Sequence, residues 1–158
     1  MTTPHSVDHD LIQAATQVAA ARSRGDNHNV AAAARDRDGR IVTAMNAYHF
    51  TGGPCAELVV IGAAAAQGAY DLVTMVAVGD RGRGVIPPCG RCRQMMLDYF
   101  PDLRVIVGAG ERLRAVPVAE LLPESYRWQD HQEHDDQQEH DGQQEHGDRQ
   151  GRDDRPAP

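Results

Sequence analysis

The sequence predicts an α/β fold, a three-layer α-β-α sandwich around a five-stranded mixed sheet. Three observations carry this prediction. Residues 8–21 repeat with the period of an amphipathic helix, an Asp-Gly pair at residues 38–39 separates two strand-like segments, and residues 72–78 form a continuous apolar run rich in β-branched side chains. At 158 residues the chain is long enough for one domain with a sizeable core.

The first elements are a helix and a hairpin. The helix is expected from Asp8 to about Ala21, with Ser6 or Asp8 as its N-terminal cap. Two strands follow, Val30–Arg35 and Arg40–Asn46, because the Asp-Gly pair between them is a strong hairpin signal. The first of these strands is rich in alanine, which is a poor strand former.

The second half of the pattern alternates helices and strands. A helix from Cys55 to Gln67 is apolar on nearly all sides, which indicates a central position in the fold. The apolar run Leu72–Val78, which follows this helix, has the composition of a buried parallel strand. The remaining elements are, in chain order, a strand at Leu72–Val78, a helix from Cys89 to about Tyr99, strands at Arg104–Val107 and Arg114–Pro117, and a short helix at Val118–Leu122.

The charge is divided unevenly along the chain. Ten of the 23 acidic residues and three of the 16 arginines lie in residues 129–158, so residues 1–128 hold thirteen of each sign and are neutral. A neutral body argues against a nucleic-acid partner, which normally requires a clustered basic face. No apolar run has the length of a membrane span, and an odd set of three cysteines is not a disulfide framework. We therefore expect a cytoplasmic protein with reduced thiols and no membrane or nucleic-acid partner.

Residues 129–158 differ in kind from the rest. They repeat a Gln/Glu/His/Asp-rich hexad three times and contain almost no apolar side chains, so they cannot offset their own ordering entropy. We expect one folded domain at 1–128 and a disordered acidic tail at 129–158. The tail histidines could bind metal weakly, but solvated low complexity is the better interpretation, and we do not assign them to the active site.

Two short stretches carry the chemistry, Pro54-Cys55-Ala56-Glu57 and Pro88-Cys89-Gly90-Arg91-Cys92. Zinc accepts thiolate ligands, and a catalytic zinc site has three protein ligands and one open position for water. The three cysteines supply that number, and no histidine lies at a ligand-like spacing near either stretch. Each stretch also begins a predicted helix, whose N-terminal partial charge would lower the thiol pKa, with Arg93 placed to help.

Glu57 lies two residues after Cys55. This offset keeps its carboxyl group close to the predicted metal without making it a ligand. Water bound near such a metal has a pKa of roughly 7. Glu57 can take a proton from that water and then protonate a ring nitrogen and a departing amine. One carboxyl group would thus act first as general base and then as general acid.

Other interpretations of the cysteines are open. A lone C-x-x-C pair can be a redox dithiol, but a redox dithiol does not require Cys55 or the glutamate beside it. A closed structural zinc site would need a fourth ligand, and buried inert cysteines would not need this spacing. The combined pattern is specific, whereas each half alone is not.

These stretches resemble the cytidine deaminase superfamily, and within it the blasticidin S deaminase branch. The matching residues are N-A-Y-H-F-T-G-G-P-C-A-E-L-V-V at 46–60, P-C-G-R-C-R-Q at 88–94, and E-L-L-P at 120–123 followed by Tyr126 and Trp128. The similarity spans about residues 8–128. It implies the three-layer fold, Zn²⁺ held by Cys55, Cys89 and Cys92, and Glu57 as the proton shuttle. It also implies a homotetramer in which loops of neighbouring subunits help to close each pocket.

The resemblance implies substrate contacts as well. Asn46 matches an asparagine that holds a ribose hydroxyl in cytidine deaminases, but Tyr48 stands where those enzymes have a glutamate. A ribose acceptor is therefore missing, which should make plain cytidine a poorer substrate. Arg83 matches an arginine that contacts substrate in blasticidin S deaminase, and a cation suits the carboxylate on that antibiotic's sugar. A solvated turn arginine is the alternative interpretation of Arg83.

Two further positions bear on the substrate. Tyr126 and Trp128 match aromatic residues that line the pocket of the family, although core packing would explain them too. Asn29 stands where blasticidin S deaminase has a substrate-contacting serine, so a related cytosine nucleoside is an alternative to blasticidin S itself.

The expected function is zinc-dependent hydrolytic deamination of the cytosine ring of a small nucleoside, blasticidin S or a close analogue, which would confer antibiotic resistance. The alternative within the same chemistry is a general cytidine or deoxycytidine deaminase of pyrimidine salvage. A binding protein that keeps the fold without catalysis would have no need of Glu57. A nucleic-acid editing role lacks the cations that hold phosphates.

Overall fold

The computed structural model describes residues 6–127, so Trp128 and the tail expected at 129–158 lie outside the described residues. The chain divides after Ser125 into two units, and every element below belongs to the first. No helix within residues 6–127 is both long and apolar enough to cross a membrane.

The elements are α1 (His9–Arg22), β1 (Val30–Asp36), β2 (Ile41–Met45), α2 (Ala56–Ala66), β3 (Leu72–Gly79), β4 (Gly84–Ile86), α3 (Gly90–Tyr99), β5 (Arg104–Val107), the 3₁₀ turn η1 (Gly110–Arg112), β6 (Arg114–Pro117) and the 3₁₀ turn η2 (Val118–Leu121).

The sheet has six strands rather than the predicted five. Its main order is β2-β1-β3-β5-β6, and the additional strand β4 pairs antiparallel with the end of β3. β4 is only three residues long and is followed by two prolines, so its sequence carries too little alternation to predict a strand. The sheet is mixed, as expected. β3 is parallel only to β5, and it is antiparallel to β1 and β4.

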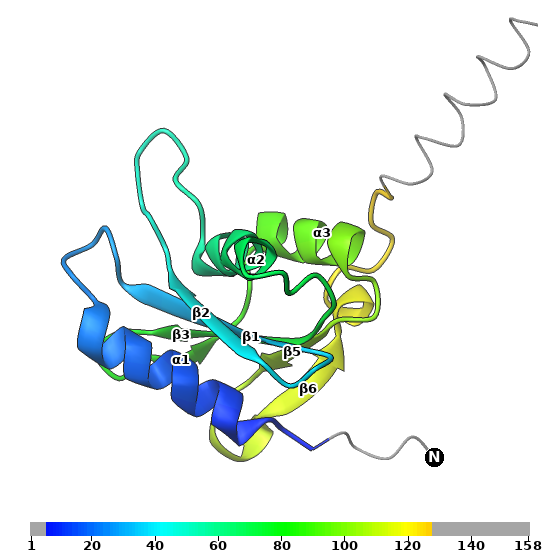
Figure 1. Cartoon of the computed structure of the whole chain (residues 1–158), viewed down its shortest axis with the longest axis horizontal. Helices are drawn as coiled ribbons and strands as arrows, with labels where there is room; N and C mark the ends of the chain where they lie inside the picture. The colour runs from blue at the N-terminus through cyan, green and yellow to red at the C-terminus, as the bar shows by residue number, and fades with distance from the viewer. Residues whose placement is uncertain (1–5, 128–158) are drawn as a thin grey trace, which may run out of the picture. The chain divides into compact units, whose positions relative to one another are not determined.

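The three predicted layers are present. α1 covers one face of the sheet, and α2 and α3 cover the other (Figure 1). Side chains of β1 alternate between the two faces: Ala31 and Ala33 pack with α1, while Ala32 and Ala34 pack with α2. Alanine is tolerated in this strand because both of its faces are buried under helices, and small side chains let those layers approach closely.

The start of α1 is fixed by Asp8. Its carboxylate accepts a hydrogen bond from the backbone N–H of Leu11 at 3.0 Å, which confirms Asp8 as the cap. The same carboxylate binds the guanidinium of Arg35 on β1, with Nε to Oδ2 at 2.6 Å and Nη2 to Oδ1 at 3.0 Å. One side chain therefore both starts the helix and attaches it to the sheet.

One edge of the sheet collects the segments that carry the predicted site. Val30 at the start of β1 pairs with Gly79 at the end of β3, and Ala31 pairs with Met45 at the end of β2. From this edge the chain continues from β2 through a loop into α2, and from β3 through β4 into α3. The loop between β2 and α2 projects from the body of the fold in Figure 1. The N-termini of α2 and α3 are thereby brought close to each other.

Candidate active site

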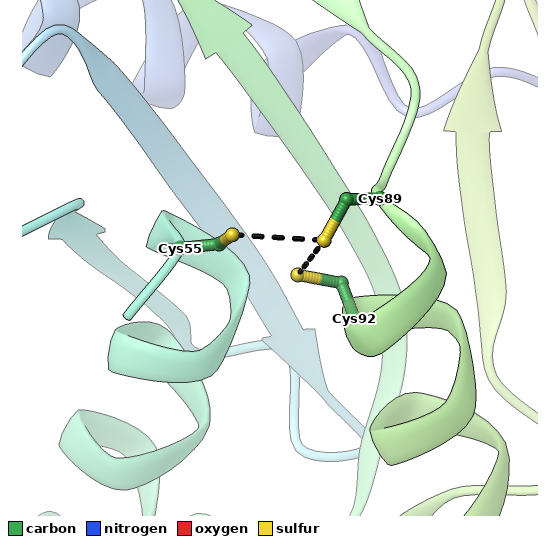
Figure 2. Close-up of side chains that lie close together, drawn as sticks. All are labelled: Cys55, Cys89 and Cys92. Atoms are coloured by element: carbon green, nitrogen blue, oxygen red, sulfur yellow. Dashed lines mark hydrogen bonds between the residues drawn. The ribbon is translucent and has the colours of Figure 1, made fainter. Parts of the chain in front are cut away.

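The three cysteine thiols meet between the starts of α2 and α3. Cys55 Sγ lies 3.7 Å from Cys89 Sγ, which lies 3.5 Å from Cys92 Sγ, and all three sulfur atoms lie within 4.8 Å of one another. Figure 2 shows the three side chains directed toward a common point. Two thiolates that bind one zinc ion at about 2.3 Å in tetrahedral geometry are about 3.8 Å apart. The observed spacing fits that arrangement, and the three ligands leave one tetrahedral position open.

Local backbone geometry produces this convergence. Cys55 and Cys89 are the N-cap residues of α2 and α3 rather than their first helical residues, and both have extended backbone angles. Neither side chain caps its own helix, so both sulfur atoms can turn toward the partner helix. Cys92 follows three residues after Cys89, a spacing that places both side chains on one side of the first turn.

Arg91 joins the two cysteine stretches. Its Nη2 donates a hydrogen bond at 3.0 Å to the carbonyl oxygen of Gly53, two residues before Cys55. Gly53 must be glycine, because a Cβ at that position would lie 1.9 Å from the carbonyl oxygen of Ala47. The tight loop and the arginine together fix the position of Cys55 relative to α3.

The three thiols differ in acidity. The helix N-termini were expected to lower the thiol pKa values, but only the pKa of Cys89 lies below its usual value. Burial raises the pKa of Cys55, and the adjacent Cys89 thiol raises it further. Burial and the Glu57 carboxylate also raise the pKa of Cys92. Burial acts in the same direction on Cys89, but the backbone N–H of Cys92, the two other thiols and the N–H of Arg91 together hold its pKa below the usual value.

This pattern suits a metal site. Zinc binds deprotonated thiols, and its positive charge offsets the repulsion that the protein alone does not remove. Arg93, which was expected beside the thiols, donates its hydrogen bonds to carbonyl oxygens. Its Nε donates to the carbonyl oxygen of Pro88 at 2.9 Å, and its Nη1 donates to the carbonyl oxygen of Leu121 at 2.8 Å. Arg93 thereby links the segment before α3 to the end of η2.

Glu57 lies in the first turn of α2 and is only 6% exposed. Burial raises the pKa of its carboxyl group, and hydrogen bonds from its own backbone N–H and from the Cys92 thiol act in the opposite direction. The carboxyl group is thus desolvated and next to the sulfur cluster. A carboxyl group with a raised pKa can hold a proton at a pH where an exposed glutamate cannot.

The predicted substrate residues Asn46 and Arg83 lie at the edge of the sheet described above. Asn46 Oδ1 accepts hydrogen bonds from the backbone N–H groups of Asn29 at 2.8 Å and Val30 at 3.0 Å. Its Nδ2 donates to Asn29 Oδ1 at 3.2 Å. Arg83 Nη2 donates to the carbonyl oxygen of Asn29 at 2.6 Å. Asn29 therefore links both residues.

The aromatic residues that sequence analysis singled out, Tyr48 and Tyr126, have exposed side chains. Tyr48 is 60% exposed, and its backbone N–H donates to the carbonyl oxygen of Asn27 at 2.9 Å. Tyr126 is 56% exposed and is the first residue of the second unit. Trp128 lies outside the described residues.

Sequence reasoning missed three residues of this region: Asp80, Arg91 and Gly53. Asp80 is 7% exposed and binds Arg83, yet it follows a strand in a turn where acidic residues are common. A signal for Arg91 was its place between two ligand cysteines. No local pattern indicates that its partner is a carbonyl group 38 residues away.

Comparison with known proteins agrees with this geometry. Residues 5–109 match the model of the cytidine and deoxycytidylate deaminase zinc-binding region. The blasticidin-S deaminase of Bacillus cereus is 34% identical over 128 residues, which cover 75% of this chain and 91% of that protein. The cytidine deaminase of Halalkalibacterium halodurans is 35% identical over 106 residues, which cover 64% of this chain and 79% of that protein.

Solved structures give the same result. The crystal structure of cytidine deaminase from Mycobacterium leprae has a TM-score of 0.63 at 33% identity and covers 75% of this chain and 100% of its own. That of cytidine deaminase from Burkholderia pseudomallei has a TM-score of 0.63 at 28% identity and covers 77% and 100%. The family model spans more than half of the chain, and the cysteine cluster fits its metal. The chain therefore belongs to the zinc-dependent cytidine and deoxycytidylate deaminase family.

Proposed function

We propose that Cys55, Cys89 and Cys92 hold the zinc ion and that Glu57 is the catalytic residue in the hydrolytic deamination of a cytosine nucleoside. The observation that carries this proposal is the buried Glu57 carboxyl group beside three convergent thiols. A redox dithiol would need only Cys89 and Cys92, whereas three sulfur atoms meet here. The products are the uracil form of the nucleoside and ammonia.

Glu57 performs the proton transfers. Zinc, when bound, polarises a water molecule so that it becomes nucleophilic near neutral pH. The Glu57 carboxylate accepts one proton of that water as the oxygen adds to the ring carbon that carries the amine. The carboxyl group gives this proton to the ring nitrogen and transfers the second water proton to the departing amine, which leaves as ammonia. Burial raises the pKa of Glu57, which suits a group that must both accept and release protons.

The substrate we favour is blasticidin S or a close analogue, that is, a cytosine nucleoside with a carboxylate on its sugar. Two residues support this. Arg83 is a cation whose side chain is 45% exposed at the edge that carries the site. Tyr48 stands where cytidine deaminases are expected to bind ribose with a glutamate. The similarity to the Bacillus cereus blasticidin-S deaminase over 75% of the chain supports the same choice. Such an enzyme would confer resistance to the antibiotic.

A general cytidine or deoxycytidine deaminase of pyrimidine salvage is the second candidate. The observation in its favour is the 35% identity to the cytidine deaminase of Halalkalibacterium halodurans. The reaction would be the same, and only the sugar contacts would differ.

The remaining features of the proposal concern the pocket and the assembly. We assign Asn46, Arg83, Tyr126 and Trp128 to the substrate pocket, and we expect a cytoplasmic homotetramer. The exposed side chains of Tyr48 and Phe50 on the projecting loop are suited to contact with a neighbouring subunit.

An ultraviolet assay of deamination tests the substrate. Purified zinc-loaded protein is compared on blasticidin S, cytidine and deoxycytidine, and kcat/KM is determined for each. The proposal predicts the highest kcat/KM for blasticidin S. A clear preference for cytidine would instead support the salvage enzyme, and no turnover of any of the three would contradict both candidates.

A further inference from the structure

We propose that Asp80 is a positioning residue for Arg83, and that Asp80, Gly79 and the backbone of Asn29 together hold the Arg83 guanidinium in a preformed orientation for a carboxylated substrate. This inference rests on the proposed function, because it assumes that Arg83 meets the substrate. It explains how the protein would select between substrates that share the cytosine ring.

Three hydrogen bonds fix one side of the guanidinium. Arg83 Nη2 donates to Asp80 Oδ1 at 2.7 Å and to the carbonyl oxygen of Asn29 at 2.6 Å, and Nε donates to the carbonyl oxygen of Asp80 at 3.4 Å. Every hydrogen bond that the Arg83 side chain makes within residues 6–127 thus uses Nε or Nη2. Nη1 is the nitrogen left to meet a ligand, on a side chain that is 45% exposed.

Asp80 is not paired with Arg83 alone. Its carboxylate is 7% exposed and is shared, since Arg81 Nε also donates to Oδ2 at 3.2 Å. Burial raises the pKa of Asp80, but the bonds from Arg83 and Arg81 hold it below the usual value, so the carboxylate is ionised at neutral pH. Arg81 also faces the exposed carboxylate of Asp26 at 3.7 Å, so the cation that this turn offers to an anionic group is the Arg83 guanidinium alone.

Gly79 provides the space in which the Arg83 side chain lies. A Cβ at this position would lie 2.7 Å from Arg83 Nε and 2.9 Å from Arg83 Cβ. The backbone at Gly79 does not have positive φ, so the requirement for glycine is one of space rather than of backbone conformation. An alanine here would displace the guanidinium from its present position.

Asn29 connects this cation to the other predicted sugar contact. Its carbonyl oxygen also accepts a hydrogen bond from the backbone N–H of Asp80 at 3.0 Å. Its side-chain Oδ1 accepts one from Asn46 Nδ2, and its backbone N–H donates one to Asn46 Oδ1. Asn46 and Arg83 are therefore held in one network through Asn29. A cation held in this way loses little side-chain entropy when it binds a carboxylate, which favours the charged substrate over one without the charge.

The test compares kcat/KM for blasticidin S with kcat/KM for cytidine in zinc-loaded Arg83→Gln, Asp80→Asn and Gly79→Ala. Arg83→Gln should lower the value for blasticidin S by about 10- to 100-fold, the effect of one charge-assisted hydrogen bond. Asp80→Asn and Gly79→Ala should each lower it by about tenfold, mostly through KM, because displacement of a positioned group is costly. In all three variants the ratio of the blasticidin S value to the cytidine value should fall, because cytidine lacks the carboxylate that Arg83 would bind.

A matched control is Asp26→Asn, which removes an exposed carboxylate 3.7 Å from Arg81 without touching Arg83. It should leave the ratio of the two values unchanged. Thermal unfolding and zinc content of each variant show whether it is folded, and Gly79→Ala tests the inference without altering any charge if Asp80→Asn proves unstable.

The outcomes separate the two claims. If Arg83→Gln lowers the ratio while Asp80→Asn and Gly79→Ala do not, the positioning role is wrong and the proposed substrate contact stands. An equal loss on both substrates in Asp80→Asn and Gly79→Ala would show a merely structural role and also overturn the inference. If Arg83→Gln leaves the ratio unchanged, the proposed contact itself fails, and the inference fails with it.

Discussion

The cysteine centre and the polar cluster of Asn29, Asn46, Asp80 and Arg83 are organised in opposite ways. At the centre the sulfur atoms face one another, and the protein leaves two of the three thiol pKa values raised. In the polar cluster the side chains bind one another and the backbone at 2.6–3.4 Å. The cysteine centre needs a metal ion to neutralise its thiolates. The side chains of the polar cluster are already held by hydrogen bonds within the protein before any ligand binds.

This difference separates chemistry from selection. Three thiolates whose negative charge the protein does not neutralise are suited to bind a metal ion strongly. A set of groups that the chain has fixed can distinguish between ligands by their fit to a rigid arrangement. The reaction class follows from the first set, and the proposed choice of sugar rests on the second.

The largest expected effect comes from breaking the cysteine centre. Cys89→Ala removes an exposed ligand, so little core packing is lost with it. Zinc content should fall from about one ion per chain to near zero, and deaminase activity should be lost, because two thiolates cannot complete the site. Metal analysis of the purified protein measures this directly, and full zinc occupancy in the variant would show that the ligand set is wrongly assigned.

A smaller effect is expected at the edge of the pocket. Tyr48→Glu restores the carboxylate that the ribose of cytidine should require, and it should raise kcat/KM for cytidine by roughly tenfold, the value of one good hydrogen bond. Tyr48→Phe, which removes only the hydroxyl group, is the matched control and should leave cytidine turnover unchanged. No gain with glutamate would mean that ribose is already held by other residues.

The smallest effect is expected far from both regions. Asp8→Ala removes the cap of α1 and its ion pair with Arg35, and it should lower the free energy of unfolding by about 1–2 kcal/mol. Asp8→Asn keeps a good cap and should cost about 0.5 kcal/mol. Neither change should alter zinc content or kcat/KM.

The pH dependence of this pair follows from the pKa of Asp8, which the Arg35 guanidinium holds below its usual value despite partial burial. The ion pair therefore stabilises the fold fully above about pH 4 and is lost as the pH falls through the folded-state pKa. Urea unfolding of wild type and Asp8→Asn should converge at low pH, and a constant difference down to pH 2 would contradict this account.

Local patterns predicted most of the fold and the centre of the site. The thiols could be found from sequence because their number, residue type and i, i+3 spacing are local, and because prolines precede the helices that carry them. The thiol acidities could not be predicted from helix position alone, since burial and neighbouring charge oppose the helix N-terminus.

Long-range pairing produced what sequence could not predict. β4 is recognised only by its register with β3, because three residues carry no period. Arg83 and Arg93 each donate one hydrogen bond to a distant carbonyl group, 54 and 28 residues away respectively, and a carbonyl group has no sequence signature.

The most direct test of the central claim is product formation by Glu57→Gln. Glutamine keeps the shape of the side chain but cannot carry the proton, so the rate of uracil-nucleoside formation should fall by about 10²- to 10⁴-fold. Zinc content should be unchanged, and Glu111→Gln, an exposed carboxylate in η1, should keep the wild-type rate. A Glu57→Gln enzyme that forms product at the wild-type rate would contradict the proposed mechanism.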